Sequence, residues 1–171
     1  MASEKDILVS NYIEAAKLAQ RSIYVSCLAS VSIALILYVS PEGVVTIPGI
    51  DLKTSGSSAF VATIGVYLVS GIMCLFAVLK CLEIKRHLSG DREIIRALNT
   101  YPSVIHTQGL LRLIALLLPW FILNATLTYN PGASKLWSFV FTFPLSGFHI
   151  AALVMTYLHE WRDFLYGMEV S

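Results

Sequence analysis

The sequence is poor in charge. Asp, Glu, Lys and Arg account for 13% of its 171 residues, and hydrophobic residues account for 56%. A soluble domain contains about 25% charged residues. The composition therefore argues against a soluble domain, and the connections between the apolar runs are too short to bury a core of their own.

Cysteine is also scarce. The three cysteines are Cys27, Cys74 and Cys81, two within apolar runs and one at the end of a run. None has a plausible disulfide partner, and no C-x-x-C spacing indicates a metal site. We interpret them as small packing residues; lipidation of Cys81 is the alternative.

Catalytic motifs are missing. The chain has no G-x-S-x-G, no H-E-x-x-H, no pair of aspartates within an apolar run and no glycine-rich loop after a strand. We therefore expect no enzymatic activity, no cofactor and no small-molecule substrate.

Long apolar runs dominate what is present. Each of the last three is long enough for the roughly 20 residues that cross a bilayer core, and the shorter first run can be extended at its start. The fold class expected is an all-α membrane protein, with four transmembrane helices in an antiparallel bundle. The spans are 23–39, 59–79, 109–129 and 136–158, joined by an outer loop (40–58), a cytoplasmic loop (80–108) and an outer turn (130–135), with flanks at 1–22 and 159–171.

Lysine and arginine are distributed unevenly between the two sides. With the N-terminus inside, ten of the twelve lie on the cytoplasmic side, and only Lys53 and Lys135 lie outside. By the positive-inside rule, we expect both termini to be cytoplasmic. No cleavable signal peptide is expected, because residues 1–22 lack a compact apolar core.

The first expected helix outruns the bilayer. Nothing breaks a helix between Ser3, a candidate cap, and Val39, and residues 1–22 are amphipathic. They form either an interfacial helix lying on lipid or a stalk that packs against another cytoplasmic segment. The second helix is expected to reach His87, and Asp91 to cap a short helix over 92–99.

Small or mildly polar residues recur at three-to-four spacing on the first two spans, which favours close helix packing. They are Ser22, Ser26, Ser30 and Ala34 on the first, and Thr63, Tyr67, Ser70, Cys74, Ala77 and Cys81 on the second. In the outer loop, Val44–Ile47 and Ile50–Lys53 flank Pro48-Gly49, which predicts a short β-hairpin.

The last span carries a polar stripe at helical spacing. Its members are Ser138, Thr142, Ser146, His149, Thr156 and Asp163. His149 lies near mid-span, where ionisable groups are rare and often functional. Hydrogen-bonded structural glue is the simpler interpretation, and a proton- or ion-linked role is the alternative.

The third span contributes Arg112, Asn124 and Pro119. Counted from the centre of the turn Asn130–Ala133, between Pro131 and Gly132, Pro119 and Pro144 lie at the same depth, so we expect helix breaks at both. Arg112 either extends toward headgroups or Glu160, or shares a polar cavity with His149. The candidate intramembrane polar site comprises His149, Arg112, Thr142, Ser146, Thr156 and Asn124.

A basic cluster lies in the cytoplasmic loop. Its members are Lys85, Arg86, Arg92 and Arg96. The cluster is more simply a topology signal than a nucleic-acid site, and no nucleic acid is expected. It is also the candidate surface for a cytoplasmic protein partner or for anionic lipid.

Four spans with an extended outer ribbon and cytoplasmic helical extensions resemble the small membrane subunits of bacterial phage-defence systems of the Kiwa type. The resemblance is one of organisation, and it implies a four-span oligomer paired with a cytoplasmic effector. The leading hypothesis is a non-enzymatic membrane subunit that self-associates and anchors or signals to a cytoplasmic partner. The alternative is an oligomeric pore, or an ion or proton pathway, lined by the polar stripe. An intramembrane enzyme is a distant third.

Overall fold

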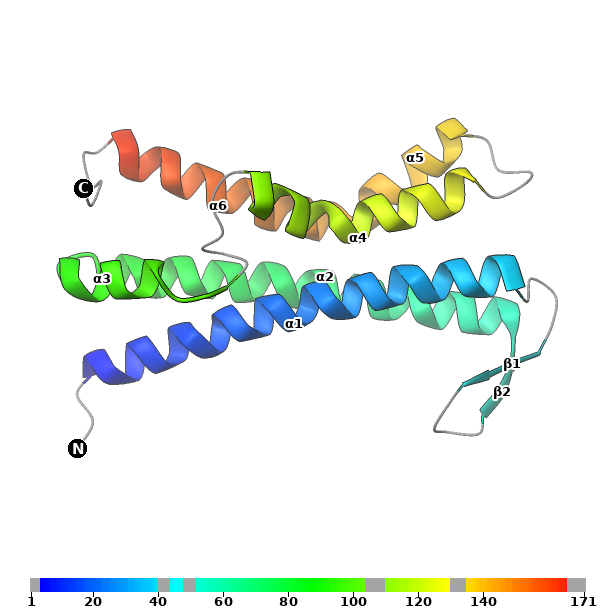
Figure 1. Cartoon of the computed structure of the whole chain (residues 1–171), viewed down its shortest axis with the longest axis horizontal. Coiled ribbons are helices and arrows are strands. Elements are labelled where there is room, and N and C mark those ends of the chain that lie inside the picture. The colour runs from blue at the N-terminus through cyan, green and yellow to red at the C-terminus, as the bar shows by residue number, and fades with distance from the viewer. Residues whose placement is uncertain (1–3, 40–43, 48–51, 104–109, 130–134, 166–171) are drawn as a thin grey trace.

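The structure is a computed structural model that describes residues 4–39, 44–47, 52–103, 110–129 and 135–165 (Figure 1). Within these ranges the chain forms six α-helices and two short strands. In chain order they are α1 (Glu4–Val39), β1 (Val44–Ile47), β2 (Leu52–Ser55), α2 (Gly56–His87), α3 (Arg92–Asn99), α4 (Leu110–Thr128), α5 (Lys135–Leu145) and α6 (Gly147–Leu165).

The helices form two layers. The long helices α1 and α2 lie side by side in one layer, and α4, α5 and α6 form the other (Figure 1). The start of α1, the end of α6 and the whole of α3 lie at one end of the molecule, which we call the α3 end. The two strands lie at the opposite end, the hairpin end.

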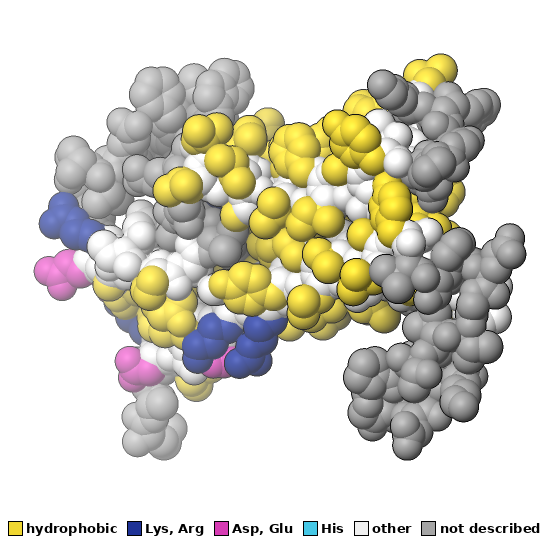
Figure 2. All heavy atoms as spheres, turned by 45° about the vertical axis from the view of Figure 1, so that its right-hand side comes forward, with side chains coloured by type: hydrophobic (Ala, Val, Ile, Leu, Met, Phe, Trp, Pro, Cys, Tyr) yellow, Lys and Arg dark blue, Asp and Glu magenta, His cyan; other side chains and the backbone are white. Residues whose placement is uncertain are grey.

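Among the described residues, three helices are long and apolar enough to cross a membrane: α1, α2 and α4. The pair α5 and α6 supplies a fourth span only if it is counted as one, because the two helices are bent by 59° at their junction. Hydrophobic side chains cover the middle of the face in Figure 2, and the coloured charged side chains lie toward one end. The helices are thus compatible with a membrane protein.

Helices α1 and α2 continue past this apolar middle into a packed extension at the α3 end. Tyr12, Ala16 and Ala19 of α1 are buried in one core cluster with Cys81 and Ile84 of α2. Leu88 and the α3 residues Ile95 and Leu98 belong to the same cluster. We call this extension (Glu4–Arg21, Lys80–His87 and α3) the stalk. Of the two interpretations of the first 22 residues, packing against another segment of the chain is confirmed for those described.

Polar contacts fix α3 to the rest of the stalk. Asp91 precedes the helix in an extended conformation, and its Oδ1 accepts a hydrogen bond from the Ile94 amide at 3.3 Å, as the sequence predicts for an N-cap. Its Oδ2 accepts from Lys5 Nζ at 2.8 Å. The predicted end of α2 at His87 and the short helix 92–99 are both confirmed.

Strands β1 and β2 pair antiparallel, with Val44 opposite Ser55 and Ile47 opposite Leu52. The predicted Pro48-Gly49 turn lies outside the described residues, as do the candidate cap Ser3 and the turn Asn130–Ala133. Ser55 caps α2 by accepting from the Ser58 amide at 3.3 Å.

The two prolines of the second layer behave differently. Pro144 is the penultimate residue of α5, and the chain bends at Ser146 before α6 begins. Helix α4 continues through Pro119, where the structure differs from the expected pair of breaks. A proline removes one amide and crowds one carbonyl, which a helix buried against neighbours tolerates. Pro119 is fully buried, whereas Pro144 is exposed.

The Lys5–Asp91 contact makes the docking of α3 pH-dependent. The hydrogen bond from Lys5 lowers the pKa of Asp91 below its ordinary value of 3.8. A lowered folded-state pKa gives stabilisation that is present above the ordinary value and is lost as the pH falls through the folded-state pKa. We expect hydrogen exchange of the α3 amides, corrected for intrinsic rate, to accelerate in that acidic range. Asp91→Asn should weaken docking at neutral pH and remove the dependence; Glu93→Gln on the same helix is the control.

Candidate intramembrane polar site

Buried polar side chains gather where α1, α2 and α6 meet. Ser26 Oγ of α1 lies 2.6 Å from Ser70 Oγ of α2 and 2.8 Å from His149 Nε2 of α6. Ser26 and His149 are completely buried, and Ser70 is 6% exposed. In an apolar environment such contacts replace the hydrogen bonds that water would supply. Three helices are therefore joined through one hydroxyl.

A second contact holds the bend between α5 and α6. Tyr67 of α2 and Ser146, the residue between the two helices, have hydroxyl oxygens 2.6 Å apart, and both side chains are completely buried. The ring of Tyr67 also lies against the imidazole of His149, with centroids 5.3 Å apart. Tyr67 therefore contacts the junction residue and the first turn of α6.

The fourth helix joins through a backbone carbonyl. Ser30 Oγ of α1 lies 3.1 Å from the carbonyl oxygen of Pro119 in α4 and 2.9 Å from that of Ser26. Its single proton is shared between these two acceptors. Farther toward the hairpin end, Tyr38 donates to the carbonyl of Thr126 at 3.1 Å. Helix α4 is thus tied to α1 at two levels.

Gly71 creates the space that His149 occupies. A Cβ atom added at Gly71 would lie 2.8 Å from His149 Cε1 and 3.0 Å from Nδ1, closer than side-chain carbons approach other atoms. The absence of a side chain at Gly71 therefore lets α6 approach α2 closely enough for His149 to reach Ser26.

Counting protons identifies the histidine tautomer. The oxygens of Ser26 and Ser70 take part in four contacts: with each other, with His149 Nε2, and with the carbonyl oxygens of Ser22 and Tyr67 at 2.9 Å each. The two hydroxyls supply only two protons. A proton on Nε2 supplies a third, so the Nε2–H tautomer satisfies one more contact. His149 Nδ1 then carries a lone pair and has no hydrogen-bond partner among the described residues.

Other members of the predicted site lie apart from this cluster. Thr142 Oγ1 of α5 donates to Asn124 Oδ1 of α4 at 3.2 Å, which pairs two predicted residues. Thr156 Oγ1 donates to the carbonyl of Leu153 within its own helix at 2.7 Å. The stripe residues Ser138, Thr142, Ser146, His149 and Thr156 are all buried, and the side chain of Asp163 lies outside the described residues.

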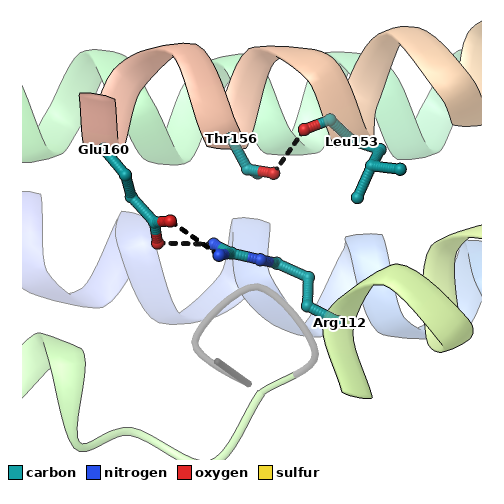
Figure 3. Close-up of polar contacts among 4 residues, drawn as sticks. All are labelled: Arg112, Leu153, Thr156 and Glu160. Atoms are coloured by element: carbon teal, nitrogen blue, oxygen red, sulfur yellow. Dashed lines mark hydrogen bonds and ion pairs between the residues drawn. The ribbon is translucent and has the colours of Figure 1, made fainter. Parts of the chain in front are cut away.

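Arg112 lies at the α3 end of the site. Its guanidinium forms a bidentate ion pair with Glu160, at 2.6 and 2.7 Å (Figure 3). The guanidinium also lies over the ring of Tyr157. Arg112 is 3% exposed, whereas the side chain of Glu160 is 51% exposed. Of the two interpretations, the contact with Glu160 is present. The described contacts do not connect Arg112 with His149.

The predicted partner surface lies on the stalk. Lys85 and Arg86 occupy the last turn of α2, Arg92 begins α3, and Arg96 is exposed on α3. Exposed acidic Glu83 and Glu93 lie on the same two helices, so the outer face of the stalk carries both signs of charge.

Sequence reasoning assigned Ser26, Ser70 and Tyr67 to packing faces and did not connect them with His149. Three or more histidine, cysteine or acidic side chains that could share a metal ion do not come together in the part of the chain that the structure describes. No protein-family model, curated protein or solved structure matches the chain. Conclusions about function therefore rest on the geometry above.

Gly71→Ala should destabilise the protein. The new methyl group must displace a histidine that is tethered to Ser26, and overpacking of this kind costs about 1–3 kcal/mol. Gly65→Ala is the matched control, because a Cβ there meets nothing within 4 Å on the same helix. Alanine at Gly65 should be neutral or stabilising by up to about 1 kcal/mol. Thermal unfolding in detergent measures the stability change of each variant. Equal changes for the two variants would contradict the close approach of α6 to α2 at Gly71.

Substitutions of His149 should separate size from hydrogen bonding. His149→Leu leaves Ser26 without its donor and should destabilise the protein by about 0.6–2 kcal/mol. His149→Gln keeps an amide donor of similar reach and should be the milder change. Denaturant titrations of the purified protein give the two differences in unfolding free energy. A leucine variant as stable as wild type would exclude a structural contribution from the His149–Ser26 bond.

Proposed function

We propose that the chain is a non-enzymatic, multi-pass subunit of a bacterial inner membrane that self-associates and anchors or signals to a cytoplasmic partner. The bent pair α5 and α6 acts as its fourth span, and both termini face the cytoplasm. The excess of lysine and arginine at the α3 end supports this orientation.

The observation that carries the proposal is the continuity of α1 and α2 from the apolar middle into the stalk. Helix α1 has 36 residues, which at about 1.5 Å per residue is much longer than a bilayer core of about 30 Å. Its first part is packed against α2 and α3 rather than left amphipathic on lipid. A packed helical extension with a charged outer face is suited to bind a protein outside the membrane.

The same continuity would transmit movement. A shift of α1 or α2 at Ser26 or Ser70 displaces the stalk as well, since α1 and α2 run unbroken between the two places. By its organisation the chain resembles phage-defence subunits, and in that setting the partner would be a defence effector.

The contacts of the polar stripe favour this function over the pore. Thr142, Ser146, His149 and Thr156 are buried within one chain, and each makes a hydrogen bond there. A pathway lined by these residues would require the helices of one subunit to separate. We therefore place the self-association surface on the exposed apolar faces.

Co-purification tests the proposal. The wild-type protein, extracted from native membranes in mild detergent, should have an oligomeric mass and retain a cytoplasmic protein. Lys85→Gln with Arg86→Gln should weaken retention about tenfold, which corresponds to about 1.4 kcal/mol, and leave the oligomeric mass unchanged. Lys53→Gln with Lys135→Gln makes the same change in charge at the hairpin end and should leave both properties unchanged. A monomer that retains no partner would contradict the proposal.

A further inference from the structure

The bend in the second layer is held by contacts at the bend itself and on its α6 side. Ser146, at the bend, is joined to Tyr67, and His149, one turn into α6, is joined to Ser26 and through it to Ser70. All five side chains are buried. We call these five residues the latch.

The two arms of the bend differ in what they pack against. Helix α6 packs on α2, whereas α5 packs mainly on α4 and points away from the α1–α2 layer (Figure 1). The outward-facing residues of α5, including Leu136, Phe139, Val140 and Phe141, are exposed. The angle of α5 therefore depends on the junction at Ser146, because α5 has little packing of its own on α1 and α2.

A second proton on His149 is incompatible with the latch. Nε2–H already points at Ser26, so the new proton would reside on Nδ1, which faces Gly71 and has no acceptor there. Among the residues that the structure describes, no carboxylate lies beside the ring to compensate the charge. The titratable groups nearest in sequence to the contacting residues are Cys27 on α1 and Tyr67 and Cys74 on α2, while α4 has only Arg112, which pairs with Glu160. An imidazolium with no counter-charge is costly in an apolar interior.

We infer that Tyr67, Ser146, Ser26, Ser70 and His149 form a proton-sensitive latch, which holds α5 at its bend while His149 is neutral and releases it when His149 takes up a proton. The proton enters on Nδ1, and the imidazolium leaves its place beside Gly71 for a more hydrated position. Ser26 then loses the hydrogen bond that His149 donates. The bend at Ser146 loses the restraint that this neighbouring hydrogen bond supplied. The latch operates whether or not a partner occupies the stalk.

Pulsed electron paramagnetic resonance on the full chain in detergent tests the latch. Alanine replaces the three cysteines, and spin labels are attached at Val66→Cys on α2 and Val140→Cys on α5, both exposed positions. The pH is varied between about 8 and about 5, the range in which histidine titrates. Wild-type His149 should give one distance population at high pH and a second one on acidification. A control pair, Leu28→Cys and Val69→Cys, spans α1 and α2 and should not change.

Variants distinguish the latch from a general effect of acid. His149→Gln cannot take up the proton and should keep the high-pH distance throughout. Gly71→Ala forces the ring out and should show the second population already at high pH, whereas Gly65→Ala should behave as wild type. An acid response that persists in His149→Gln, a pH-independent wild-type distance, or a Gly71→Ala protein with the undisturbed high-pH distance would each overturn the latch.

Discussion

Ser26 has one hydroxyl proton and three polar atoms within 3 Å: the carbonyl of Ser22, the hydroxyl of Ser70 and Nε2 of His149. One proton cannot serve all three contacts, and the arrangement of the helices depends on this shortage of protons. Because the imidazole supplies the missing proton, α1, α2 and α6 are held together by hydrogen bonds among buried side chains. Apolar contacts alone would leave their relative rotation poorly determined in a membrane, because lipid tails are as apolar as the side chains that they replace.

The geometry around this cluster explains why the second layer is bent. Pro144 cannot donate to the preceding turn, so α5 ends near it, and the change in direction falls at Ser146, where Tyr67 accepts or donates a hydrogen bond. Pro119 lacks the same donor, yet α4 passes through it at a position that is buried and where Ser30 of α1 contacts the Pro119 carbonyl. The same residue type thus gives two outcomes, decided by what surrounds it.

These elements also show how far the sequence could be interpreted alone. Hydrophobic length and caps predicted the helix bounds near His87 and over 92–99, and the spacing of polar residues predicted which face of the last span is buried. Periodicity reports the face of one helix but not its partner in another. For that reason Ser26, Ser70 and Tyr67 were identified as packing residues, and their contact with His149 was missed. Gly71 carried no local signal, since its role depends on the approach of α6.

The ion pair at the α3 end gives a buried ionisable group a counter-charge, in contrast to His149. Arg112 is almost completely buried, but Glu160 neutralises it and remains half exposed, so the pair keeps access to polar surroundings. The five N–H donors of the Arg112 guanidinium are fixed in a plane that matches a carboxylate. Arg112 is therefore a rigid tie between α4 and α6. His149 has no such counter-charge and must stay neutral to remain where it is. The α5–α6 pair is thus tied by an ion pair at the α3 end and, near its bend, by the hydrogen bond of His149 with Ser26. Under the proposed latch, the larger movement is therefore expected in α5, beyond the bend, while the ion pair holds the far end of α6.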